Sequence, residues 1–148
     1  ILDSQIKKRN IIASLYLDEL RDYYEKYNIL KKPNFNYKFS LNKNQKQLSG
    51  KSIHAFYRLN LFVNKDKINQ LKLLEQFNQK KIDCGVGSCP EIYREKVFKK
   101  FKLYPKKRLT NAKLLGETSI TFPIDANRKL TKVKREILLI KRIFNKYI

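Results

Sequence analysis

Three residues of types that bind metals or act as nucleophiles lie in two separate parts of this sequence. His54 is the only histidine, and Cys84 and Cys89 are the only cysteines, with four residues between them. A structural zinc site takes four ligands, and a catalytic triad needs further partners that no spacing here identifies. The three residues are therefore weak evidence for a metal centre, and we expect ordinary buried or turn thiols. A single cysteine pair makes no disulfide framework, which fits a reducing cytoplasm.

Two glycines, Gly85 and Gly87, follow a segment with strand character. Glycine lets backbone amides approach an anion closely, so the pair raises the question of a phosphate loop. The Walker pattern would need a following Lys-Ser/Thr pair, and the dinucleotide-binding pattern would need a third glycine; neither is present. A tight turn is therefore the favoured interpretation, although the segment from Gly85 to Glu91 can still line a cleft.

Positive charge dominates the composition. The 148 residues carry a formal net charge of +21, and 26 of the 34 basic residues are lysine. Nucleic-acid sites favour arginine, which pairs bidentately with phosphates and bases, whereas these lysines are scattered over nearly every segment. A basic solvated surface without a nucleic-acid partner is favoured, and a basic nucleic-acid-binding protein of ribosomal type is the alternative. The longest aliphatic run, Ile137 to Ile140, is far too short to cross a bilayer, so no membrane span is expected.

The elements that must position these residues begin with a long amino-terminal helix. Its mostly apolar stripe has spacings of three and four and consists of Leu2, Ile6, Arg9, Ala13, Tyr16, Leu20, Tyr23 and Tyr27. The polar stretch from Lys31 to Gly50 predicts an exposed loop or hairpin. Residues 53–63 are rich in aromatic and β-branched types, which predicts the central strand. Its inner face would be formed by Ile53, Tyr57, Leu59, Leu61 and Val63.

Further elements complete a single domain. A helix capped by Asn64 or Asp66 would present Ile68, Leu71, Leu74 and Phe77 to the core. Shorter elements are expected at Ile82–Val86 (strand), Glu91–Phe101 (helix), Asn111–Leu115 (helical turn) and Thr118–Ile124 (strand). An amphipathic helix capped by Thr131 would end the chain, with an inner face of Val133, Ile137, Ile140, Phe144 and Tyr147. This order predicts an α/β fold of the α+β kind, a small, mainly antiparallel sheet with helices on one face.

Five segments match one family pattern in order: residues 5–20, 54–59, 82–98, 108–119 and 130–131. The third contains Gly-Ser-Cys-Pro-Glu-Ile-Tyr at residues 87–93. Together they resemble the carboxy-terminal part of the DegT/DnrJ/StrS family of sugar aminotransferases, pyridoxal 5'-phosphate (PLP) enzymes of fold type I. The resemblance implies that residues 1–148 form the small carboxy-terminal domain of such an enzyme and that the large PLP-binding domain is missing.

The resemblance also implies a two-stage transamination. In the family, a lysine holds PLP as a Schiff base, a donor such as glutamate leaves its amino group on the cofactor, and a keto-sugar nucleotide collects it for amino-sugar and surface-polysaccharide biosynthesis. The catalytic lysine and the cofactor's phosphate site belong to the large domain, so the fragment would not be catalytic alone. A cytoplasmic homodimer is implied for the intact enzyme.

On this resemblance, the chain supplies one wall of the substrate cleft and part of the dimer contact. The substrate-binding residues would be His54, Tyr57 and Arg58 on the strand and Gly87, Ser88, Cys89 and Glu91 on the turn. Arg58 would face a diphosphate or the donor carboxylate by bidentate pairing, and a solvent-side position on the strand is the alternative. Residues 125–130 and 89–91 replace a His-Pro-Thr-Leu-like stretch and a His-Tyr pair that many relatives have, so no role of those histidines is carried over.

Overall fold

A computed structural model describes residues 2–31, 54–87 and 89–148 of the chain. Its elements are α1 (Leu2–Glu19), α2 (Arg21–Glu25), β1 (Leu30–Lys31), β2 (Arg58–Val63), α3 (Gln70–Gln79), β3 (Gly85–Val86), η1 (Ile92–Arg94), α4 (Lys96–Lys100), α5 (Thr110–Thr118), β4 (Ser119–Pro123), α6 (Leu130–Phe144) and η2 (Asn145–Tyr147). The strands form one sheet in the order β1-β2-β4-β3, and each neighbouring pair is antiparallel. The predicted α/β fold with a small antiparallel sheet is confirmed.

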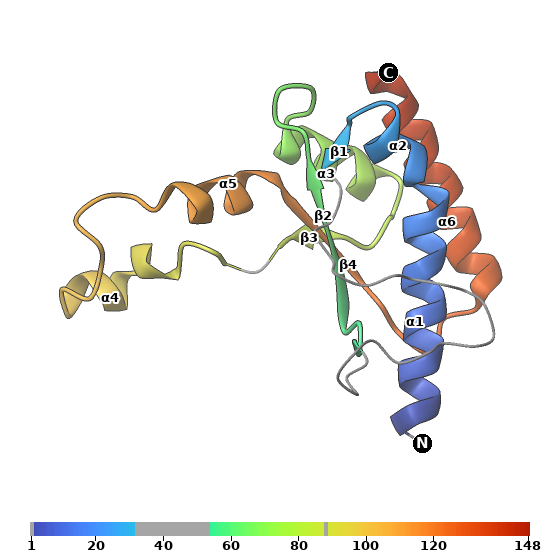
Figure 1. Cartoon of the computed structure of the whole chain (residues 1–148), viewed down its shortest axis with the longest axis horizontal. Coiled ribbons are helices and arrows are strands. Elements are labelled where there is room, and N and C mark those ends of the chain that lie inside the picture. Colours follow the sequence, from blue (N-terminus) through green and yellow to red (C-terminus); the bar gives the residue numbers. More distant parts are fainter. Residues whose placement is uncertain (1, 32–53, 88) are drawn as a thin grey trace.

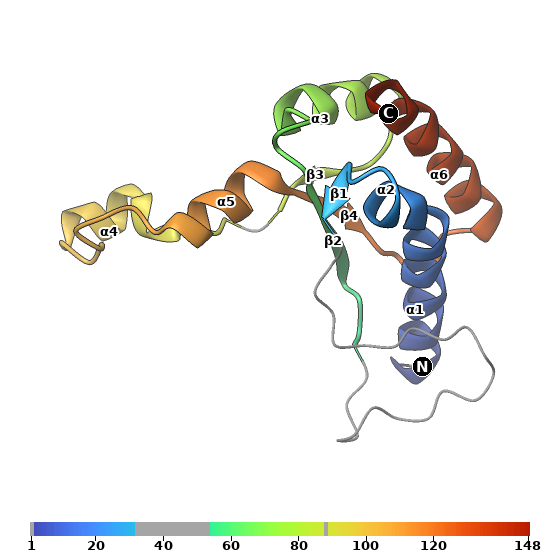
Figure 2. The same ribbon diagram turned by 45° about the horizontal axis from the view of Figure 1, so that its top comes forward.

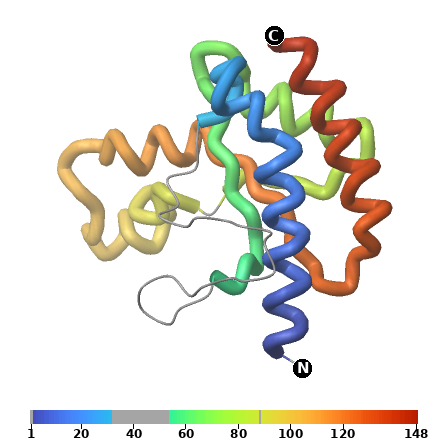
Figure 3. The backbone as a smooth tube through the Cα atoms, turned by 45° about the vertical axis from the view of Figure 1, so that its right-hand side comes forward, coloured from blue at the N-terminus to red at the C-terminus, as the bar shows by residue number. Residues whose placement is uncertain are grey.

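One face of the sheet packs against helices, as expected from the sequence. Figures 1 and 3 show α1 and α6 side by side along this face. Phe122 of β4 is fully buried, and its ring centroid lies 5.4 Å from that of Tyr16 in α1 and 6.1 Å from that of Phe77 in α3. Phe77 also contacts Phe144 of α6 edge-on, at 5.8 Å. The aromatic cluster therefore joins the sheet to all three helices and forms the centre of the core.

A polar cluster joins α1 to α6 inside this core. The Tyr16 hydroxyl donates a hydrogen bond to the Glu136 carboxylate, which also accepts one from Arg128 Nη2 at 2.5 Å. Glu136 and Tyr16 are both buried. Burial raises the pKa of Tyr16, and the neighbouring Glu136 carboxylate raises it further. The two donors compensate the buried Glu136 carboxyl group for its lost hydration.

Three details of the predicted helices are wrong. The amino-terminal helix is interrupted at Leu20, which separates α1 from α2. Asn69 caps α3 by accepting a hydrogen bond from Lys72 N at 3.0 Å, so neither Asn64 nor Asp66 is the cap. Phe77 is buried as predicted, but Leu73 is buried in place of Leu71, which is 67% exposed. Helix α6 begins after Lys129 without a side-chain cap, so Thr131 has no capping role.

The inner face of the central strand differs from the prediction at its beginning. Leu59, Leu61 and Val63 are buried as predicted, but Tyr57 is 69% exposed. Phe56 has a positive φ of 42° and is buried instead. This left-handed residue changes the backbone direction before Arg58, so the alternation of strand side chains starts only there. Ile53 and residues 32–50 of the predicted loop lie outside the described residues, and Lys31, the first residue of that loop, belongs to β1.

Residues 89–117, here called the arm, project from the sheet and include η1, α4 and most of α5 (Figures 1 and 2). Every described residue of the arm is exposed or only partly buried. Its exposed large apolar residues are Ile92, Val97, Phe101, Leu103, Tyr104, Leu109, Leu114 and Leu115. The single helix predicted for Glu91–Phe101 is two short elements, η1 and α4. In the described part of the chain, no helix has the length and apolar character needed to cross a membrane.

Candidate functional site

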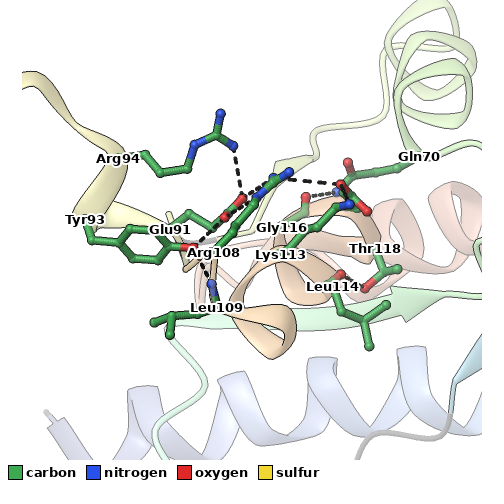
Figure 4. Close-up of polar contacts among 11 residues, drawn as sticks. Gln70, Glu91, Tyr93, Arg94, Arg108, Leu109, Lys113, Leu114, Gly116 and Thr118 are labelled. Atoms are coloured by element: carbon green, nitrogen blue, oxygen red, sulfur yellow. Dashed lines mark hydrogen bonds and ion pairs between the residues drawn. The ribbon is translucent and has the colours of Figure 1, made fainter. Parts of the chain in front are cut away.

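The base of the arm is held together by the carboxylate of Glu91 (Figure 4). Arg108 approaches it bidentately, with Nε 2.7 Å from Oε1 and Nη2 2.6 Å from Oε2. The Tyr93 hydroxyl donates to Oε1 at 2.7 Å and accepts a hydrogen bond from Leu109 N at 3.1 Å. Arg94 adds a longer ion pair of 3.4 Å. This group, the Glu91 brace, joins the outgoing and returning limbs of the arm.

A second polar contact attaches the arm to the body of the domain. Gln70, at the start of α3, is buried, and its Nε2 donates to Gly116 O at 3.1 Å and to Ser119 O at 2.6 Å. These carbonyls lie at the carboxy-terminal end of α5 and the beginning of β4 (Figure 4). The side chain therefore fixes the angle at which α5 meets the sheet, while the Glu91 brace fixes the limbs to one another.

The brace predicts an unusual titration. Hydrogen bonds from Arg108, and then from Tyr93, lower the pKa of the Glu91 carboxyl from 4.5 to about 2. A lowered carboxyl pKa means that the brace stabilises the arm fully above pH 4.5 and loses this contribution as the pH falls toward 2. Carboxyl carbon shifts followed by NMR should therefore place the Glu91 midpoint near the lower value. In the Arg108→Ala variant the midpoint should rise toward 4.5; a midpoint near 4.5 in the unmodified protein would refute the brace.

The predicted strand residues lie together at the beginning of β2. His54 is exposed, and its Nδ1 accepts a hydrogen bond from Phe56 N at 3.0 Å. Its carbonyl accepts from the Asn10 side chain of α1 at 2.8 Å. Arg58 is exposed and its guanidinium carbon lies 5.5 Å from the ring centroid of Tyr57, a cation–π arrangement. Arg58 is therefore held on the sheet face opposite the helices, on the solvent side.

The predicted turn residues lie at the other end of the sheet. Gly87 N donates to Ser119 O at the beginning of β4, whereas Arg58 pairs with Pro123 at its end. Ser119 and Pro123 are four positions apart on β4, which corresponds to about 13 Å in an extended strand at 3.3 Å per residue. The two groups of predicted residues therefore start from opposite ends of β4. Cys89 and Glu91 continue from Gly87 into the base of the arm, and Ser88 lies outside the described residues.

Gly87 is a position where a side chain does not fit. A Cβ atom there would lie 2.4 Å from Ser119 Oγ and 2.7 Å from Ser119 Cβ, whereas one at Gly85 would meet only Thr121 Cγ2 at 3.9 Å. We expect Gly87→Ala to lower the free energy of unfolding by about 1–3 kcal/mol through overpacking, and Gly85→Ala to have little effect. Urea unfolding of the two variants gives the comparison. Adding Ser119→Gly to Gly87→Ala should restore stability, and equal losses in both glycine variants would contradict the steric account.

Three polar residues beside these glycines were not singled out from the sequence. Asn60 Oδ1, Ser119 Oγ and Thr121 Oγ1 are buried and have no hydrogen-bond partner among the described residues. Asn60 and Thr121 are cross-strand partners, and Gly85 pairs with Thr121 on the other side. They follow Arg58 on the face opposite the helices. An unsatisfied buried acceptor is costly, so this polar face is a feature of the sheet that packing alone does not explain.

The two cysteines do not form a reactive site. Both are free thiols, and burial raises the pKa of Cys84 to about 11, with Asp83 and Glu136 acting in the same direction. Its nucleophilic thiolate is thus suppressed. Cys89 is exposed, 4.0 Å from Glu95 Oε1. Within the described ranges, no group of three or more His, Cys, Asp and Glu side chains is placed to hold a metal ion.

The lysines of the described segments lie at the surface of the domain. In residues 2–31, 54–87 and 89–148, every lysine is exposed except Lys141, which is half-buried and pairs with Glu19 at 3.0 Å.

Solved structures of aminotransferases share this fold. The chain is similar to the aminotransferase from Psychrobacter cryohalolentis, with 27% identity and a TM-score of 0.82 over 99% of this chain and 36% of that one. PseC of Helicobacter pylori, an aminotransferase involved in the biosynthesis of pseudoaminic acid, gives 18% identity and a TM-score of 0.70 over 96% and 33% of the two chains. A GDP-4-keto-6-deoxymannose-3-dehydratase with a trapped PLP-glutamate geminal diamine gives 14% and 0.64 over 91% and 31%.

The chain thus spans about a third of the length of these solved structures. No curated protein sequence matches it significantly. The sequence profile of the DegT/DnrJ/EryC1/StrS aminotransferase family, in contrast, matches residues 1–138, in agreement with the resemblance seen in the sequence. Because this match covers nearly all of the sequence, the chain belongs to the DegT/DnrJ/EryC1/StrS aminotransferase family.

Proposed function

We propose that this chain is the carboxy-terminal small domain of a cytoplasmic sugar-nucleotide aminotransferase, whose large PLP-binding domain is not part of residues 1–148. The enzyme transfers an amino group from glutamate to a keto-sugar nucleotide, which yields 2-oxoglutarate and an amino-sugar nucleotide for surface polysaccharide. The observation that carries the proposal is the family match over residues 1–138. PLP supplies the chemistry, and the chain shapes the substrate cleft.

The isolated chain is not catalytic on this proposal. Two observations support this: its described lysines are solvent-exposed apart from Lys141, and its length is about a third of that of the solved aminotransferases. A transaminase site needs both the lysine that carries the cofactor and groups that hold the cofactor's phosphate. Both functions belong, on this proposal, to the large domain.

The chain contributes two separate parts of the cleft wall. His54, Tyr57 and Arg58 form one part, in which the Arg58 guanidinium above Tyr57 presents positive charge to a phosphate or carboxylate. The turn residues Gly87, Ser88 and Cys89 form the other, with Glu91 fixing the arm beside them. Their separation of about 13 Å along β4 suits an elongated nucleotide sugar that extends from one end of the sheet to the other.

The arm supplies a contact with the partner subunit of a homodimer on this proposal. Phe101 and Leu103 are 63% and 66% exposed, and they belong to a set of eight exposed large apolar residues on the arm. Apolar surface gathered on one projecting element is typical of an interface. Sedimentation of the intact enzyme should therefore give a dimer, and Phe101→Asp combined with Leu103→Asp should shift it toward the monomer.

The coding DNA upstream of Ile1 tests the proposal that the catalytic lysine lies in a separate domain. An open frame continuous with this one, encoding a PLP domain with a Schiff-base lysine, is the expected finding. Co-expression gives a second test if that domain is encoded separately: the two chains should copurify and acquire transaminase activity together. A start codon at this point with no such domain nearby, and polyanion binding on one face that falls steeply with salt, would favour a nucleic-acid-binding protein instead.

A further inference from the structure

The two limbs of the arm border a shallow pocket that is largely open to solvent. It has a volume of about 190 Å³ and is lined by Tyr93, Arg94, Lys99, Tyr104, Pro105 and Arg108. The lining residues come from η1 and α4 on the outgoing limb and from the loop before α5 on the returning limb. The pocket therefore exists only while the Glu91 brace keeps the limbs together.

Positive charge exceeds negative charge around this pocket. Arg94, Lys99 and Arg108 contribute three cations, and the lining itself contains no acidic residue. Glu91, outside the lining, pairs with Arg94 at 3.4 Å and with Arg108 at 2.6 Å, and Glu117 lies 3.9 Å from Arg108. Arg108 uses Nε and Nη2 for Glu91, which leaves Nη1 without a hydrogen-bond partner among the described residues. Lys99 likewise has no ion-pair partner in the described part of the chain. Guanidinium and ammonium groups on one pocket wall have the charge and the hydrogen-bond donors that a phosphoryl group binds.

Aromatic surface lies next to these cations. Tyr93 is fixed by hydrogen bonds with Glu91 and Leu109 N, so its ring is held in place before any ligand arrives. Tyr104 is 52% exposed on the other limb. Tyrosine faces can stack on a nucleoside base, whereas the cations can neutralise phosphate oxygens. The combination suits a nucleotide better than it suits a carboxylate.

We propose that the arm pocket binds a phosphoryl group through Arg94, Lys99 and Arg108. We assign this phosphoryl group to a nucleotide sugar, which carries a diphosphate next to a nucleoside; this assignment rests on the function proposed above. Arg94 and Lys99 are binding residues, while Arg108 both binds and keeps the pocket in shape through Glu91. The pocket is separate from the Arg58 group, which lies at the far end of β4.

Titration calorimetry at low salt tests the proposal, with UDP, dTDP, GDP, inorganic diphosphate and uridine as probes and the 148-residue chain as the protein. The nucleotides and diphosphate should bind, and uridine should bind much more weakly. Arg94→Ala and Lys99→Ala should each weaken binding about tenfold, the effect of losing one charge-assisted hydrogen bond. Lys96→Ala and Lys107→Ala are matched controls, because each removes one charge from the arm outside the pocket. Circular dichroism confirms that each variant folds.

Two results would overturn the proposal: no binding of diphosphate or any nucleotide, or equal weakening by the control and pocket variants, which would indicate general attraction to a basic surface. If one nucleotide binds more tightly than diphosphate, the bound phosphoryl group belongs to a nucleotide. If nucleotides and diphosphate bind equally tightly, that assignment is overturned. The outcome is separable from the proposed function. If the intact enzyme transfers amino groups and both pocket variants keep an unaltered KM, the pocket proposal is refuted and the proposed function stands. If nucleotides bind but no amino group is transferred, the proposed function is refuted and the pocket proposal stands.

Discussion

Replacing Phe122 with alanine is expected to lower the free energy of unfolding by about 4 kcal/mol. Its ring is fully buried and packs against the rings of Tyr16 and Phe77, so truncation leaves a cavity that rigid strands and helices on all sides cannot close. For a domain of this size the melting temperature should fall by about 8–16 °C. Thermal and urea unfolding followed by circular dichroism measure both quantities.

Phe101→Ala is the matched control for this loss. The same substitution on the arm removes a side chain that is 63% exposed and should change the stability by less than about 0.5 kcal/mol. Comparable losses in both variants would mean that the exposed arm contributes as much packing as the aromatic cluster beneath β4, which would contradict this account.

Replacing Glu136 with alanine should cost about 3 kcal/mol. The substitution leaves the buried Tyr16 hydroxyl and the mostly buried Arg128 guanidinium without the carboxylate that both contact. This estimate is at the lower end for a broken buried ion pair because Arg128 retains 14% exposure of its side chain. The measurement is urea unfolding at neutral pH.

Glu75→Ala removes an exposed glutamate from α3 and provides the control, with an expected effect within about 0.5 kcal/mol. A double-mutant cycle with Arg128→Ala separates the pair from its surroundings. The double variant should be more stable than the sum of the two single losses predicts, because it no longer buries an unpaired charge. Additive losses would show that Glu136 and Arg128 are not energetically coupled.

The parts of the fold that follow from simple periodicity could be predicted from the sequence. The alternation of Leu59, Leu61 and Val63 identified the inner face of β2, and Val133, Ile137 and Ile140 identified that of α6. Both predictions succeed because a buried face imposes its period on the sequence wherever the backbone is regular. The family could also be inferred, since its five motifs span the chain in order.

The irregular positions could not be predicted in this way. Tyr57 continues the alternation of β2, but the left-handed backbone at Phe56 turns it outward. Leu71 fits a helical period as well as Leu73 does, so the pattern alone cannot choose the phase of α3 before its cap is known. Asn69 is the cap of α3, but Asn64 and Asp66 are of residue types that cap helices equally well, so the sequence alone does not choose among the three.

The candidate site shows the same limit over longer distances. Arg108 ends a basic run that begins at Lys106, and nothing in the local sequence sets it apart, yet it pairs bidentately with Glu91, 17 residues earlier in the chain. Only the return of the arm brings the two together. Glu91 itself was identified from its motif, but as a substrate contact. Whether it touches substrate stays a prediction, while its structural role as the brace depends on contacts that no local pattern encodes.

The most direct test of the proposed function is to follow nitrogen from labelled glutamate into sugar nucleotides, using the polypeptide encoded by the complete reading frame and supplied with PLP. We expect the label to appear in an amino-sugar nucleotide, with one 2-oxoglutarate formed for each keto-sugar nucleotide consumed and none formed by the 148-residue chain alone. Formation of 2-oxoglutarate without labelled sugar across a panel of keto-sugar nucleotides, or transfer by the short chain alone, would contradict the account.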